Sequence, residues 1–70
     1  MEHYTAILRE LEAGGFATSV HRMVSYCELR AVKVPAGEPI CIARCDDDSD
    51  AGVMVAARQL AKMCGVVLAG

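Results

Sequence analysis

The chain has 70 residues and a mass of 7.5 kDa, a length that fits one domain and leaves no room for a second. Hydrophobic residues make up 54% of the sequence, which excludes a disordered chain, although eleven of them are alanine. Seven basic and nine acidic residues give a net charge of −2, which argues against strong electrostatic attraction to nucleic acid or anionic membranes. We therefore expect a single domain, residues 1–70, with a thin core.

The first predicted element is an amphipathic helix over residues 2–13. Apolar residues recur at intervals of three and four, which places them on one face of a helix: Tyr4, Ile7, Leu8 and Leu11. The pair Gly14–Gly15 ends this helix, because glycine readily adopts the left-handed conformation of a helix C-terminus.

The middle of the chain is rich in β-branched residues, which predict extended structure. Segments 25–34 and 40–45 have the pattern of antiparallel partners, joined by a turn at 35–39 in which two prolines flank a glycine. A weaker pattern predicts a further strand at about residues 18–23.

A second helix is predicted after the acidic residues that follow these strands. Asp47, Asp48 or Ser49 can cap its N-terminus, and Gly65 can end it. We expect the apolar tail 66–68 to fold back onto the core. The apolar stripe of this helix has spacings of three and four residues: Val53, Ala57, Leu60 and Cys64.

This order of elements predicts an α+β fold of two layers, with both helices on one face of an antiparallel meander of two or three strands. The predicted core combines alternate strand residues with five helix residues: Leu8, Leu11, Val53, Ala57 and Leu60.

The four cysteines, Cys27, Cys41, Cys45 and Cys64, lack the paired spacing of a structural zinc site. We expect them to be reduced thiols that fill the core, with no disulfide and no metal. A thiol or metal site built from Cys27, Cys45, Cys64 and His21 is an alternative that only the fold could assemble.

No catalytic or calcium-binding signature is present. Counted from Asp46, the acidic segment has Ala51 at position six and Ala57 at position twelve, where a calcium loop requires glycine and glutamate. No local motif joins a serine or thiol to a histidine as a nucleophile. We therefore expect no enzymatic activity, no catalytic residue and no cofactor.

With the weaker strand included, the order α-β-β-β-α resembles the double-stranded-RNA-binding domain. The resemblance covers nearly the whole chain and rests on the Gly14–Gly15 helix end, the strands 26–34 and 40–45, and the alanine-rich helix 51–65. It implies an RNA-binding alternative function. The family contacts phosphates through lysines at the start of the last helix, whereas this chain has four aspartates at 46–50, which would repel RNA.

Basic residues also fall on the predicted strands. Arg22, Arg30 and Arg44 could share one face of the sheet, where Glu28 would make the surface one of mixed charge. We therefore do not expect nucleic acid as a partner.

Segments 31–34 and 40–44 carry apolar residues at both alternating positions, so strand alternation cannot make the uncovered sheet face polar. The leading interpretation is a small protein-interaction module that self-associates as a homodimer through the open sheet face or edge, with another protein as a further candidate partner. The predicted interaction surface contains five aliphatic residues: Val32, Val34, Ile40, Ile42 and Val55.

No apolar stretch reaches the 18 residues of a membrane span, and the N-terminus lacks the features of a signal peptide. We expect no membrane association and a cytoplasmic location.

Overall fold

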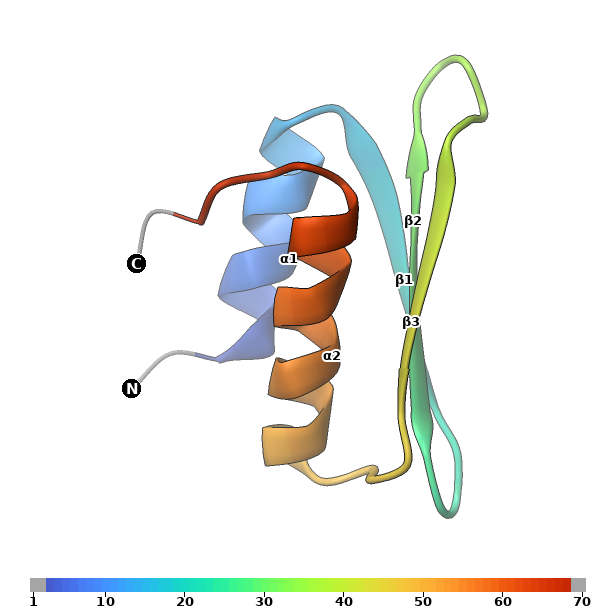
Figure 1. The fold of residues 1–70 in the computed structure, drawn as a ribbon, viewed down its shortest axis with the longest axis vertical. Helices are drawn as coiled ribbons and strands as arrows, with labels where there is room; N and C mark the ends of the chain where they lie inside the picture. Colours follow the sequence, from blue (N-terminus) through green and yellow to red (C-terminus); the bar gives the residue numbers. More distant parts are fainter. Residues whose placement is uncertain (1–2, 69–70) are drawn as a thin grey trace.

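In chain order, the structure has one helix, three antiparallel strands and a second helix. The computed structural model describes residues 3–68, with elements α1 (Tyr4–Ala13), β1 (Phe16–Arg22), β2 (Cys27–Lys33), β3 (Ile40–Cys45) and α2 (Asp50–Met63). Both helices lie on the same face of the sheet, α2 over the side where β3 lies and α1 over the side where β1 lies (Figure 1). The predicted two-layer α+β fold is confirmed, and its α-β-β-β-α order is that of the domain which the sequence resembles.

The sheet is fully antiparallel with β2 at its centre. Leu29 lies opposite Val20 on β1 and opposite Ala43 on β3, and all three side chains point toward the helices. The odd-numbered residues of β2 and β3 therefore form the covered face, and the even-numbered residues form the open face. Apolar residues occur at both odd and even positions of these strands, and the register decides that the odd-numbered ones are buried. The sequence pattern left this question open.

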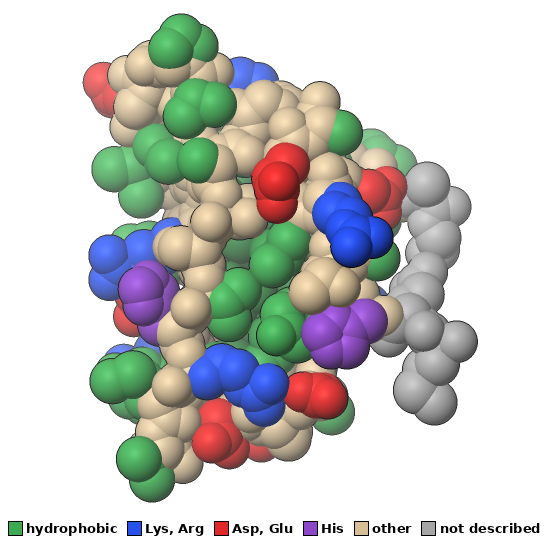
Figure 2. All heavy atoms as spheres, turned by 180° about the vertical axis from the view of Figure 1, so that it is seen from behind, with side chains coloured by type: hydrophobic (Ala, Val, Ile, Leu, Met, Phe, Trp, Pro, Cys, Tyr) green, Lys and Arg blue, Asp and Glu red, His purple; other side chains and the backbone are tan. Residues whose placement is uncertain are grey.

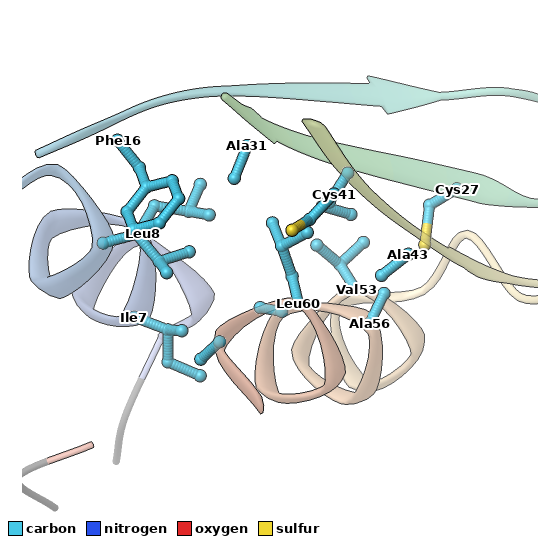
Figure 3. Packing of buried hydrophobic residues seen from close by; sticks show 14 residues of the cluster. Ile7, Leu8, Phe16, Cys27, Ala31, Cys41, Ala43, Val53, Ala56 and Leu60 are labelled. Carbon is cyan, nitrogen blue, oxygen red and sulfur yellow. The ribbon is translucent and has the colours of Figure 1, made fainter. Parts of the chain in front are cut away.

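The core lies between the sheet and the helices and contains many small side chains (Figure 3). Its largest fully buried side chains are Leu11, Leu29 and Leu60. All five predicted helix residues of the core are buried, and the tail residues Val66 and Leu68 pack against the core as expected. The buried residues are Ile7, Leu8, Leu11, Phe16, Cys27, Leu29, Ala31, Cys41, Ala43, Val53, Ala56, Ala57, Leu60 and Ala61.

The connection between α1 and β1 is shorter than the sequence pattern indicated. Gly15 has a φ of +92°, which turns the chain directly into β1 at Phe16, two residues before the predicted start. The ammonium group of Lys33 lies 4.9 Å from the centre of the Phe16 ring and donates a hydrogen bond of 2.8 Å to the carbonyl oxygen of Gly14. Lys33 thus caps the C-terminus of α1 from the neighbouring strand.

Both ends of α2 are capped. The hydroxyl of Ser49 accepts a hydrogen bond of 3.2 Å from the N–H of Gly52 at the N-terminus. At the C-terminus, Gly65 has a φ of +73°, and the N–H of Val66 donates to the carbonyl oxygen of Ala61. This pattern is a Schellman motif, which explains why the tail reverses toward the core at the predicted glycine.

Replacing Leu60 by alanine should lower the free energy of unfolding by about 2–5 kcal/mol, because it leaves a cavity where α2 meets the sheet. Urea denaturation measures the change. The control is Val55→Ala on the exposed side of the same helix, which should change stability little. Equal effects of the two substitutions would contradict this orientation of α2.

Replacing Gly52 by alanine should destabilise the fold, although alanine favours a helix by about 1 kcal/mol. A Cβ at this position would lie 2.3 Å from the carbonyl oxygen of Asp47, so the loop before α2 would have to move. Urea denaturation measures the free energy of unfolding of this variant and of the parent protein. A more stable Gly52→Ala variant would show that the loop does not approach the helix so closely.

Candidate interaction surface

The face of the sheet that the helices leave open has an apolar end and a charged end. Strand pairing arranges its side chains in three rows, each crossing from β1 through β2 to β3: Ala17, Val32 and Ile40; Ser19, Arg30 and Ile42; His21, Glu28 and Arg44. Hydrophobic character therefore falls from the β2–β3 turn toward the β1–β2 turn.

Four aliphatic residues at the apolar end are called the hairpin patch below: Val32, Ile40 and Ile42 on the strands, and Val34 in the turn after β2, where the hydrogen bond from its N–H to the carbonyl oxygen of Gly15 continues the alternation of the strand. Ile40 is 64% exposed, Val34 48% and Ile42 47%, while Val32 is half-buried opposite Ile40. Hydrophobic side chains gather at this end of the sheet layer, at the upper left of Figure 2. Grouped exposure of this kind is typical of a surface that contacts a partner.

At the other end of the open face, the charged groups pair with each other. The guanidinium of Arg30 donates a hydrogen bond of 2.6 Å to Glu28, and that of Arg44 stacks 4.1 Å from the centre of the Tyr26 ring. On the β1 and β2 side of this end is a shallow hollow of about 200 Å³, lined by His21, Met23, Tyr26, Glu28 and Arg30. This end offers a mixed-charge surface, as the sequence indicated for Arg30 and Arg44.

The fifth predicted surface residue lies elsewhere. Val55 is 59% exposed on α2, in the helix layer, whereas the hairpin patch is on the opposite side of the sheet. The structure thus brings together four of the five predicted residues. Helical periodicity identified Val55 as outward-facing, but only the layer arrangement separates it from the sheet residues.

Arg22 also departs from the expected arrangement. It does not share a face with Arg30 and Arg44, because its position in β1 directs it to the helix side of the sheet. There its guanidinium donates a hydrogen bond of 3.0 Å to the carboxylate of Asp50 and another to the carbonyl oxygen of Asp48. Arg22 therefore ties the end of β1 to the start of α2.

The acidic residues before α2 serve local structure. The carboxylate of Asp47 accepts a hydrogen bond of 2.9 Å from the N–H of Ser49, which lowers the pKa of the Asp47 carboxyl. Asp46 pairs with Arg44 at 3.5 Å, and Asp50 pairs with Arg22. These contacts fit the expected role of the segment in capping the helix.

The cysteines all belong to the covered side of the sheet. Cys27 and Cys41 are buried, and Cys45 and Cys64 are half-buried against the core. His21 points to the opposite face, so the structure does not bring it to the three thiols of the alternative site. Among residues 3–68, no group of three or more His, Cys, Asp or Glu side chains is placed to hold a metal ion.

Two of these thiols are shifted toward the protonated form. Burial raises the pKa of Cys27. Burial, together with a hydrogen bond to Cys41, raises the pKa of Cys64 to about 11. Because the thiolate is the reactive form, both groups are poor nucleophiles at neutral pH. This chemistry agrees with their place as packing residues.

No known protein family matches the sequence, and comparisons with curated proteins and with solved structures find no match. The likeness to the double-stranded-RNA-binding domain is therefore one of topology alone. Over the described residues 3–68, neither helix is long and apolar enough to cross a membrane.

The free energy of unfolding should fall as the pH rises from about 9 toward 11. In the unfolded chain a cysteine thiol ionises with a pKa of 9.0, whereas folding holds the proton on Cys64 up to about 11. The folded state then binds more protons in this range, so alkaline conditions favour unfolding. Urea denaturation at the two ends of this pH range should show a smaller decrease in the free energy of unfolding for Cys64→Ala than for the parent protein. Equal losses would contradict the raised pKa.

Proposed function

We propose that this protein is a small, non-enzymatic protein-interaction module that associates with a second copy of itself through the hairpin patch. The observation that carries this proposal is the grouping of Val34, Ile40 and Ile42, each about half exposed or more, on the sheet face without helices. Full burial of one such side chain is worth about 1.5–3 kcal/mol. Burial of several together can therefore support association.

A second copy is the partner that best fits this surface. The hairpin patch carries no charge of its own, so it needs no charged complement from a different protein. A core of this size is thin, and a twofold contact would add the apolar burial that a 70-residue chain lacks.

The charge distribution favours protein association over RNA binding, the alternative that follows from the topology. Arg30 and Arg44 on the open face pair with Glu28 and Asp46, so no uniformly basic surface forms there. The start of α2 is acidic where the resembling family has lysines.

Light scattering at micromolar concentration should give a mass near twice 7.5 kDa. The substitution Ile40→Lys should weaken association at least about tenfold, because it puts a charge into the buried patch. The control is Val24→Lys, which changes an exposed aliphatic residue between β1 and β2, away from the hairpin patch and from α2, and should leave association unchanged.

A mass of 7.5 kDa at every concentration would overturn the proposal of self-association. Equal weakening by the two lysine substitutions would overturn the assignment to the hairpin patch.

A further inference from the structure

The hydrogen-bond pattern of β3 leaves one edge of the sheet available. The N–H of Lys33 donates to the carbonyl oxygen of Pro39, which fixes the odd-numbered residues of β3 as those bonded to β2. The N–H and C=O groups of Ile40, Ile42 and Arg44 therefore point away from the sheet. Within residues 3–68, no backbone hydrogen bond from another segment reaches these groups.

The features that usually protect an edge strand are sparse along β3. Its six residues, ICIARC, include no proline or glycine, and the pairing with β2 is continuous without a bulge. The side chains of Ile40 and Ile42 belong to the hairpin patch and lie along this same edge. Unpaired backbone groups and exposed apolar side chains thus coincide on β3.

We infer that two copies pair antiparallel through β3 across a twofold axis at Ile42, which joins their sheets into one of six strands. This inference rests on the proposed self-association and specifies its geometry. In this register Ile42 lies opposite Ile42 of the second copy, and Ile40 lies opposite Arg44 of the second copy. Three hydrogen-bonded residue pairs, with about six bonds in all, then satisfy the outward groups of both strands.

The side chains are compatible with this register. The two Ile42 side chains are neighbours on the open face and shield each other from water, so each hairpin patch buries apolar area at the contact between the copies. The two Arg44 residues are separated by about 13 Å along the strands, given a rise of about 3.3 Å per residue. Like charges therefore do not meet at the new contact.

The arrangement of the helices is also compatible with pairing through β3. Helix α2 packs on both β2 and β3, so it lies about one strand spacing, about 4.8 Å, from the twofold axis beside β3. The two α2 helices would therefore be about 10 Å apart, which is a usual distance between packed helices. Ala56 points from α2 toward Ala43 on β3 (Figure 3). Helical periodicity puts Gln59 and Met63 on the flank that Ala56 begins, and Met63 is 49% exposed. That flank carries no charge.

The opposite edge of the sheet is less suited to a twofold pairing. Along β1, the open-face side chains are Ala17, Ser19 and His21, which are small or polar. Helix α1 and β1 flank a hollow with hydrophobic side chains at its floor (Figure 2), but no aliphatic patch borders β1 on the open face. Pairing through β1 is therefore an outcome that the test must distinguish from pairing through β3.

Hydrogen exchange followed by NMR tests the inference on the unmodified protein. The amides of Ile40, Ile42 and Arg44 should be protected, and their protection should rise with protein concentration. The amides of Thr18 and Val20, which point outward from β1, should exchange fast at every concentration. Concentration-dependent protection of β1 alone would overturn pairing through β3.

Substitutions on the two edge strands provide a second test of pairing through β3. Arg44→Pro removes one outward donor without changing the hairpin patch and should weaken dimerisation at least tenfold, whereas Arg44→Ala keeps the donor and should dimerise like the parent. Thr18→Pro makes the same change on the β1 edge and should have no effect on association.

The outcomes separate the two proposals. A dimer with fast exchange at Ile42 and unchanged association of Arg44→Pro would overturn the edge geometry while self-association stands. A monomer at all concentrations would overturn both. If Arg44→Pro fails to fold, the exchange pattern of the unmodified protein still decides.

Discussion

Helix α2 packs on β2 and β3 through a core in which small side chains surround Leu29 and Leu60. Ala43 on β3 and Ala56 on α2 point toward each other (Figure 3), and Ala31 and Ala57 are buried in the same core. Close packing of this kind fixes which side of each strand faces the helix, since a shift by one residue would exchange the two faces. It also leaves the bulkier Ile40 and Ile42 on the outside. The open apolar surface is thus a consequence of the way in which the core is filled.

Much of the fold could be predicted from local patterns. The strand at 40–45 is found at Ile40–Cys45, and the glycine-limited helices lie where their periodicity indicated. The boundary of β1 could not be located as well, because Phe16 enters the core only through the positive φ of Gly15 and the contact with Lys33. Such a contact between distant segments has no local signature.

The candidate site was predictable in composition but not in arrangement. Apolar residues at both parities of β3 indicated a surplus, yet only the register assigns Ile40 and Ile42, together with Val32, to the open face. Val55 matched the pattern equally well and lies in the other layer. The outward direction of the β3 backbone groups follows from the hydrogen bonds between strands. Local sequence patterns do not predict which residues make these bonds.

The central claim is that a second copy of the chain associates at the β3 side of the surface left open by this packing. Isotope-filtered NOE spectroscopy on a mixture of labelled and unlabelled protein tests it most directly, because it detects only contacts between copies. The account predicts intermolecular NOEs from the methyl groups of Ile40 and Ile42. Intermolecular NOEs confined to α1 and β1, or none at concentrations well above micromolar, would contradict it.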